Sequence, residues 1–292
     1  MNHQTKTRIF KLLDKLPAKM GYGLYHIFQN IKESKSFKQN IKSNTNTYTS
    51  LVKILNSKNL SIEGKEIIEI GSGWIPAMPY EFLYKGKAKK IYTYDLNKHY
   101  QKNKILKFNK DYFADKNFIK FDHLEYAIDN RIKYFPNQNI IFQKLNKVDF
   151  VFSRFVLEHV TPYDLFEMHK KFYNEFDNKT KIIHFISPSD HRAFSDKSIS
   201  LQDFLKYSQD EWNRIQTKFD YHNRLRLPQY IEIFKSTGFE IEFLSYDNPD
   251  VNSETFAKFK KIKINTDFNS FSDEELTAGS LIVILKKNDE HI

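Results

Sequence analysis

Two glycines follow a short apolar run in a spacing that suits binding of a nucleotide-like ligand. Residues 66–70, Glu-Ile-Ile-Glu-Ile, predict a β-strand, and Gly71-Ser72-Gly73 comes directly after it. Glycine lets the backbone pass close to a ligand because no Cβ stands in the way. A helix that begins after such a turn directs free N–H groups toward polar or anionic ligand groups. The sequence therefore predicts a cofactor-binding turn at the carboxyl edge of a parallel sheet.

Two carboxylates accompany this turn. Glu69 stands two residues before Gly71, and Asp95 follows the next predicted strand, residues 90–94. A carboxylate at that second place can accept hydrogen bonds from both hydroxyls of a ribose. The third glycine of the dinucleotide fingerprint is absent, because Trp-Ile-Pro follows at 74–76. This absence counts against an NAD(P)-dependent oxidoreductase, which we keep as an alternative.

Two histidines follow later predicted strands and are candidate general bases. His159 lies in the Leu-Glu-His-Val segment at 157–160, after the strand at 148–153. His191 follows Asp190 after the strand at 181–186. A neighbouring carboxylate can orient an imidazole and raise its basicity, so we assign that role to Asp190. Glu158 is interpreted as a structural residue.

Residues 221–226, Tyr-His-Asn-Arg-Leu-Arg, hold two of the seven arginines in the chain. Arginine forks suit phosphate or carboxylate groups, although the segment can also be an exposed basic turn before a helix. We predict that four of its side chains contact a substrate: Tyr221, Asn223, Arg224 and Arg226. Asp190, His191 and His222 are of types that ligate metals. Nothing in the sequence brings them together, so we predict no metal.

The composition narrows the class of protein. The 292 residues carry a net charge of +10, but only seven of the 46 basic residues are arginine, and the lysines are scattered. This pattern disfavours nucleic acid as a partner, because phosphate and base recognition favour arginine. There are no cysteines, which excludes disulfides and thiolate chemistry and fits a cytoplasmic protein. The chain shows no transmembrane run and no secretory signal.

Alternating strand and helix patterns predict an α/β fold with helices on both faces of a parallel sheet. The predicted strands cover 66–70, 90–94, 140–145, 148–153, 181–186, 240–245 and 280–285. The predicted helices cover 48–57, 76–84, most of 98–134, a segment that begins after Thr161, 200–217 and 227–237.

With these segments in place, residues 48–287 resemble class I S-adenosylmethionine-dependent methyltransferases. The Glu-x-Gly-x-Gly turn at 69–73, the acid after the second strand and the Leu-Glu-His-Val segment carry the resemblance. A narrower likeness is to bacterial methyltransferases with Ser-Asp-His and Asn-Arg-Leu-Arg segments, here 189–191 and 223–226. The resemblance implies a Rossmann-like seven-stranded, mostly parallel sheet whose last strand is antiparallel. It implies methyl transfer from S-adenosylmethionine, which we expect at an oxygen of a small polar molecule or glycan precursor.

The resemblance also implies roles for single residues. Gly71, Ser72 and Gly73 would line the methionine half of the cofactor, and Glu69 would hold its ammonium group. Asp95 would bind the ribose diol, with Leu96 against adenine. The residue that caps the adenine amine would follow the third strand, where the predicted strand at 140–145 leaves Gln143 and Asn146 as candidates.

The resemblance also divides the chain. Residues 1–46 are expected to be an N-terminal helical extension and connector, and 47–292 the methyltransferase domain, with an acceptor-site insertion near 190–226. Within the extension, the amphipathic segment 8–29 packs on its own domain or contacts a membrane surface or partner. Residues 31–46 are expected to be a mobile connector or cofactor-covering loop. A non-catalytic scaffold and an RNA methyltransferase remain further alternatives.

Overall fold

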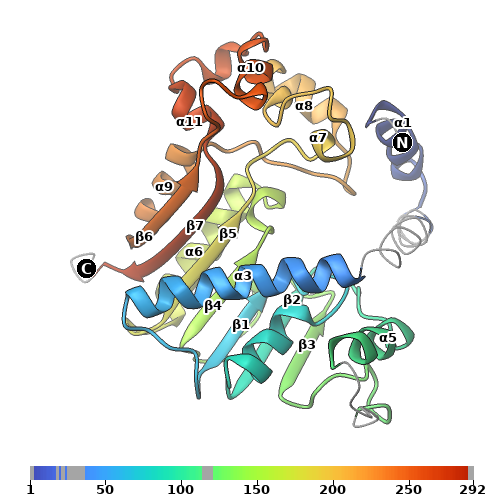
Figure 1. The fold of residues 1–292 in the computed structure, drawn as a ribbon, viewed down its shortest axis with the longest axis vertical. Helices are drawn as coiled ribbons and strands as arrows, with labels where there is room; N and C mark the ends of the chain where they lie inside the picture. The colour runs from blue at the N-terminus through green and yellow to red at the C-terminus, as the bar shows by residue number, and fades with distance from the viewer. Residues whose placement is uncertain (1–2, 18–19, 21–23, 25–36, 114–120, 289–292) are drawn as a thin grey trace. The chain divides into compact units, whose positions relative to one another are not determined.

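Figure 1 shows the chain in a computed structural model, which describes residues 3–17, 20, 24, 37–113 and 121–288. Seven strands form one sheet in the order β3-β2-β1-β4-β5-β7-β6. The sheet is mostly parallel, and its last strand, β7, is antiparallel. The predicted architecture is therefore confirmed. The strands are β1 (Glu66–Ile70), β2 (Lys90–Asp95), β3 (Ile132–Pro136), β4 (Phe150–Arg154), β5 (Lys181–Ile186), β6 (Phe239–Asp247) and β7 (Gly279–Lys287).

The chain folds as two compact units. The β1 unit contains residues 32–154 and 174–183, and the β7 unit contains residues 1–31, 155–173 and 184–292. Among the described residues, no helix combines the length and the apolar content needed to cross a bilayer.

The β1 unit is built on strands buried on both faces. Ile68 of β1, Ile91 of β2 and Val151 of β4 are completely buried, as expected for parallel strands covered by helices. The helices of this unit contribute Phe108 to the same core. They are α3 (Phe37–Ser57), α4 (Ala77–Tyr80), the π-helical turn η1 (Glu81–Lys85), α5 (Lys102–Tyr112) and the 3₁₀ turn η2 (Ile140–Phe142).

The β7 unit holds a second apolar cluster beside its part of the sheet core. Phe204, Leu205 and Trp212 pack there with Phe259, Phe268 and Leu276. The cluster joins the segment after β5 to the long connection between β6 and β7, whose helices were not predicted. The helices and helical turns of this unit are α1 (His3–Asp14), η3 (Leu157–His159), α6 (Pro162–Glu175, through Tyr173), α7 (Arg192–Ser195), η4 (Asp203–Lys206), α8 (Gln209–Ile215), α9 (Leu227–Ser236), α10 (Glu254–Lys260), η5 (Thr266–Phe268) and α11 (Asp273–Thr277).

The predicted connector before residue 47 is wrong in its second half. Residues 37–46 belong to α3, which runs without interruption to Ser57. The Lys, Ser and Asn side chains mostly face outward, while Phe37, Leu51 and Leu55 are buried. A helix with so narrow an apolar face resembles a polar loop in composition. Residues 31–36, and much of the predicted 8–29 segment, lie outside the described residues.

The third strand was also predicted in the wrong place. Helix α5 ends at Tyr112, residues 121–131 form turns, and β3 covers residues 132–136. β3 pairs in parallel with β2, with Phe135 beside Tyr94 and their rings 4.6 Å apart. The predicted strand at 140–145 is instead the turn η2, which the Asn139 side chain caps by accepting from the Ile141 N–H. The strand β3 is short and lies in lysine-rich sequence, so its alternation of apolar and polar residues was too weak to predict it.

Two buried histidines meet inside the β7 unit. His169 of α6 and His184 of β5 are fully buried, and their Nε2 atoms lie 3.1 Å apart. Burial lowers the pKa of His169 to about 4, and burial together with His169 lowers the pKa of His184 well below its ordinary value. Both imidazoles are therefore neutral in the folded protein at neutral pH.

This pair predicts an acid-sensitive fold. The unfolded chain binds protons at these histidines from about pH 6.5 downward, whereas the folded chain resists protonation at His169 until about pH 4. The free energy of unfolding should therefore fall as the pH drops, by about 2 kcal/mol at pH 5 from His169 alone. Urea unfolding of the parent protein and of His169→Gln between pH 7 and 5 measures this loss of stability. An equal pH slope in both proteins would contradict the prediction.

Candidate functional site

The predicted glycine turn lies after β1 in the β1 unit, and both glycines need their conformational freedom. Gly71 has φ +80° and Gly73 has φ +59°, in the left-handed region that disfavours other residues. The Gly71 N–H donates to the Tyr94 carbonyl of β2, 2.8 Å away, which holds the turn to the sheet. A Cβ on Gly73 would meet no atom within 4 Å. The turn thus presents open space beside exposed backbone.

Glu69 lies under this turn with its carboxyl group buried. The side chain is 4% exposed and accepts a 2.6 Å hydrogen bond from Thr93 Oγ1 on the neighbouring strand. Burial raises the pKa of Glu69 to about 8, and the negative charge of Asp95 contributes in the same direction. The carboxyl group is therefore largely protonated at neutral pH unless a cation lies beside it.

Asp95 ends β2, and its carboxylate is held in place by three neighbours. Ser72 Oγ donates to Oδ2 over 3.1 Å, the Asn97 N–H donates to Oδ1 over 2.8 Å, and His99 Nε2 lies 3.5 Å from Oδ1. Leu96, the next residue, is 63% exposed. The structure therefore brings Glu69, Ser72 and Asp95 together, and it leaves an apolar side chain exposed next to them.

The structure adds a residue to this group that the sequence did not indicate. Tyr100 is 2% exposed, and its hydroxyl has no hydrogen-bond partner among the described residues. Burial is the largest cause that raises the pKa of the Tyr100 hydroxyl, and the charges of Glu69 and Asp95 raise it further. A buried hydroxyl without a partner costs free energy, which a polar ligand would recover. No spacing rule in the sequence pointed to Tyr100.

The residues that follow the third strand also change. Because β3 ends at Pro136, the next residues are Asn137, Gln138 and Asn139, and not Gln143 or Asn146, which lie after η2. The Gln138 N–H donates to the Asp95 carbonyl over 2.9 Å. The loop after β3 therefore runs beside the end of β2, where Gln143 and Asn146 were expected to act.

The β7 unit gathers the predicted histidines. One ligand atom from each of Glu158, His159 and His191 lies within 4.8 Å of the others. Glu158 is fully buried on η3, and its Oε1 lies 4.0 Å from His191 Nε2. His222 stands beside them, with its ring centre 5.0 Å from that of His191 and 5.7 Å from that of His159. These residues come from three segments that are far apart in the sequence.

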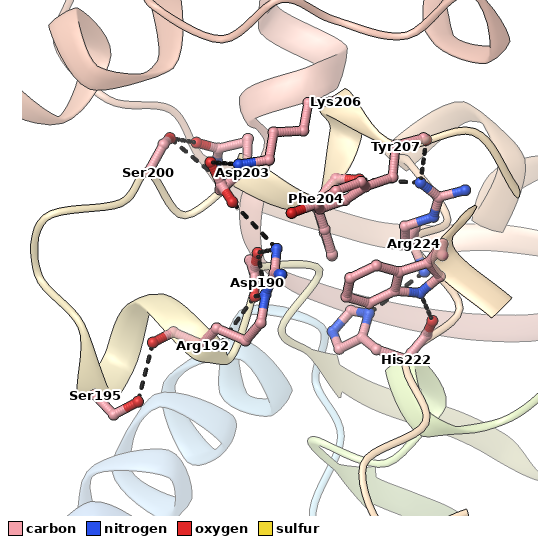
Figure 2. Close-up of polar contacts among 12 residues, drawn as sticks. Asp190, Arg192, Ser195, Ser200, Asp203, Phe204, Lys206, Tyr207, His222 and Arg224 are labelled. Carbon is pink, nitrogen blue, oxygen red and sulfur yellow. Dashed lines mark hydrogen bonds and ion pairs between the residues drawn. The ribbon is translucent and has the colours of Figure 1, made fainter. Parts of the chain in front are cut away.

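Asp190 does not orient His191 as predicted. Figure 2 shows its carboxylate against Arg192, whose Nη2 lies 2.6 Å from Oδ2, and Arg192 also reaches Asp203 over 3.2 Å. Asp190 is 1% exposed. The carboxylate beside His191 is instead Glu158, which was interpreted as structural.

Asn223 ties the η3 turn to the loop before α9. Its side-chain amide donates to the Leu157 and Val160 carbonyls over 2.7 and 2.9 Å. Tyr221 presents its backbone carbonyl to His159 Nδ1 over 2.8 Å, so that nitrogen carries the proton. Both residues therefore support His159, and their contact with a substrate stays a prediction.

Arg224 and Arg226 are buried, and their donors bind other parts of the protein. Arg224 donates to the Phe204 and Tyr207 carbonyls over 3.0 and 2.7 Å (Figure 2). Arg226 is completely buried and donates to the carbonyls of Pro188 and Leu276. Burial lowers the pKa of both to about 10. These contacts account for the Arg226 guanidinium without a substrate, whereas Arg224 Nε has no hydrogen-bond partner among the described residues, and substrate contact by either stays a prediction.

A cavity of about 200 Å³ in the β7 unit is lined by all three clustered histidines. Arg192, Trp212 and Phe10 of α1 also face it. Phe10 packs edge-on against Phe219, with ring centres 6.2 Å apart, so this part of the N-terminal extension contacts its own chain. The cavity, with its mixed polar and aromatic lining, has the size to admit part of a small molecule.

Compared by sequence, the chain matches no protein-family model and no curated protein. Compared by structure, it is similar to magnesium protoporphyrin IX methyltransferase from Synechocystis PCC 6803 with bound SAH, at 13% identity and a TM-score of 0.50, with 86% of each chain covered. It is also similar to a candidate sarcosine dimethylglycine methyltransferase from Galdieria sulphuraria, at 12% identity and a TM-score of 0.51, covering 84% of this chain and 86% of that one. The chain has the Rossmann-like fold of these two proteins.

The contacts of Arg226 predict a structural role that can be separated from substrate binding. Arg226→Met leaves the carbonyls of Pro188, Arg224 and Leu276 without their donor, so the free energy of unfolding should fall by about 3 kcal/mol. Arg214→Met, at an exposed arginine of α8, is the matched control and should change it by less than about 0.5 kcal/mol. Unchanged stability of Arg226→Met in urea unfolding would contradict the structural role.

Proposed function

We propose that this protein is an S-adenosylmethionine-dependent methyltransferase that methylates an oxygen of a small polar molecule or glycan precursor. The observation that carries the proposal is the group at the carboxyl ends of β1 and β2. There, an open glycine turn, a buried Glu69 and a positioned Asp95 lie together. The shared fold supports the proposal, since ligands of open α/β sheets bind at this edge.

The donors and acceptors of the β1 unit fit this cofactor. Glu69 would accept hydrogen bonds from the ammonium group of S-adenosylmethionine. The positive charge of that group would keep the buried carboxylate ionised. Asp95 would accept the two ribose hydroxyls, oriented by Ser72 and the Asn97 N–H. The hydroxyl of Tyr100 would donate to a polar group of the cofactor and so gain the partner it lacks.

For adenine, the exposed Leu96 offers an apolar surface, and Gln138 offers an amide in the loop beside Asp95. We propose Gln138 in place of Gln143 and Asn146, because Gln138 follows the observed third strand. An amide side chain has both a donor and an acceptor for the adenine edge.

On the acceptor side, His159 is the proposed general base. The sulfonium of the cofactor supplies the methyl group to the acceptor oxygen. Because His159 Nδ1 donates to the Tyr221 carbonyl, the lone pair of the neutral ring lies on Nε2 and can take the proton of an acceptor hydroxyl. His191 is the second candidate base. An alcohol is barely ionised at neutral pH, so such a base would assist the transfer.

We also propose the division of the chain that the sequence suggested, with an earlier boundary. Because α3 runs through residue 47, we place the boundary at its start: the residues before 37 would form a helical extension and the rest the methyltransferase domain, with the insertion near 190–226 shaping the acceptor pocket. The cavity lined by His191, Arg192 and Trp212 supports this role for the insertion. The packing of Phe10 on Phe219 favours contact of the extension with its own chain over contact with a membrane.

Isothermal titration with S-adenosylmethionine tests the cofactor directly. We expect saturable binding that weakens about 10- to 100-fold in Asp95→Ala, since a charged acceptor of two hydroxyls is lost. Asp111→Ala, at an exposed aspartate of α5, is the matched control and should bind like the parent. NADH is titrated in parallel. If the folded protein bound NADH and not S-adenosylmethionine, the result would contradict the methyltransferase and favour the oxidoreductase. If it bound neither, the result would favour the non-catalytic scaffold.

The raised pKa of Glu69 predicts a pH-dependent affinity. Below about pH 8 the carboxyl group is mainly protonated and must lose its proton to accept an ammonium group. The affinity for S-adenosylmethionine should therefore rise between pH 6 and 7.5, by up to about tenfold per pH unit. In Glu69→Gln the affinity should be lower and nearly independent of pH in that range. A pH-independent affinity in the parent protein would contradict this role of Glu69.

A further inference from the structure

The cluster of Glu158, His159 and His191 has a chemistry that a general base alone does not require. The three side chains place one ligand atom each within 4.8 Å of the others. The ring centres of His159 and His191 are 5.0 Å apart. Two imidazoles on one tetrahedral ion, with metal–nitrogen bonds of about 2.0–2.1 Å, have ring centres about 5 Å apart. The spacing of the rings therefore allows a shared metal ion, although an edge-on ring contact has the same spacing.

The orientation of His159 agrees with this reading. A metal-ligating histidine usually donates its other ring N–H to a carbonyl or carboxylate, which fixes the tautomer and aims the lone pair. His159 does so through Nδ1, which donates to the Tyr221 carbonyl over 2.8 Å. That carbonyl belongs to the loop held to η3 by Asn223. The supporting contact is thus built into the fold and does not depend on a mobile side chain.

Charge and burial point the same way. Glu158 is fully buried, and a third imidazole, His222, is 4% exposed beside the cluster. His222 Nε2 has no hydrogen-bond partner among the described residues. One buried carboxylate and three adjacent imidazoles offer a negative charge and several lone pairs to a single cation. Of this set, Glu158 and His222 are buried, whereas His159 is exposed and His191 partly exposed, so a bound divalent ion would offset the cost of the buried carboxylate.

We propose that Glu158, His159 and His191 bind one divalent transition-metal ion, with His222 in the wall of its site. Two histidines and one carboxylate suit Zn²⁺, Mn²⁺ or Fe²⁺ and disfavour Mg²⁺ and Ca²⁺, which prefer oxygen ligands. The 4.0 Å separation of Glu158 Oε1 and His191 Nε2 would have to shorten when the ion binds. The His191 side chain is 30% exposed, directly precedes α7 and stacks on Phe194, with ring centres 5.0 Å apart.

The site also has room for a further ligand, since His159 and His191 line the 200 Å³ cavity. A three-residue site leaves a coordination position open to a small oxygen ligand. If the proposed methyl transfer is correct, that ligand is the acceptor oxygen, and the ion would make its hydroxyl acidic enough to release the proton to solvent, with His159 and His191 acting as ligands in place of the base role proposed above. This use of the metal rests on the proposed function, whereas metal binding itself does not.

The test measures metal binding without the cofactor. The full chain is stripped with EDTA, desalted and titrated separately with ZnCl₂, MnCl₂ and MgCl₂ by calorimetry, and the bound metal is counted by mass spectrometry. We expect one Zn²⁺ or Mn²⁺ per chain, a raised unfolding temperature and no response to Mg²⁺. His159→Gln and His191→Gln should each weaken binding by tenfold or more.

His159 is exposed, so His159→Gln is expected to fold even if Glu158→Gln does not. His123→Gln, at an exposed histidine of the β1 unit, is the matched control and should bind metal like the parent. The proposal is overturned if the parent takes up no ion, or if uptake is equal in the parent, His159→Gln and His191→Gln. Metal binding without S-adenosylmethionine binding would support this metal site and contradict the proposed methyltransferase. S-adenosylmethionine binding without metal binding would support the methyltransferase and overturn the metal site.

Discussion

The burial of ionisable groups is the constraint on which both candidate sites depend. Glu69 is almost fully buried near the charge of Asp95, and this placement raises the pKa of its carboxyl group. A protein tolerates such a group only where it is hydrogen-bonded, neutral or matched by a cation. Thr93 supplies one hydrogen bond, and the open turn at Gly73 leaves space where a cation can come. The free-energy cost of burying the ionised Glu69 carboxylate is therefore the best argument that a cationic ligand group binds beside it.

The β7 unit answers the same constraint in another way. Its two buried arginines donate to backbone carbonyls and lie over aromatic rings, so Arg226 faces Phe204 at 5.1 Å and Arg224 faces Phe268 at the same distance. Arg226 joins the loop before α9 to Leu276 in the connection between β6 and β7, and Arg224 joins it to Phe204 and Tyr207 in the segment after β5. They hold in place the loop that presents the Tyr221 carbonyl to His159. Arg224 and Arg226, which the sequence suggested as substrate ligands, thus stabilise the loop that supports the histidine cluster.

That cluster changes one expectation about which residues act together. Asp190 was the expected partner of His191, yet Arg192 occupies its carboxylate. Glu158 was expected to be structural, and its Oε1 lies 4.0 Å from His191 Nε2. Adjacency in the sequence did not decide these pairs, because Asp190 and His191 point to different neighbours after β5. A carboxylate on η3 and a histidine from the next segment meet instead.

Much of the fold was determined by the sequence alone. The apolar run at 66–70, the glycine turn, the acid after β2 and the capped start of α6 each depend on contacts within a few residues, and each lies where it was predicted. The predictions that failed concern polar, lysine-rich stretches, where a narrow buried face hid α3 and β3. The residues of the β1 and β2 ends were therefore identified by local pattern. Tyr100, Gln138 and the convergence of Glu158 with three histidines were decided only by the tertiary structure, because they depend on which distant segments the sheet order and loop packing bring into contact.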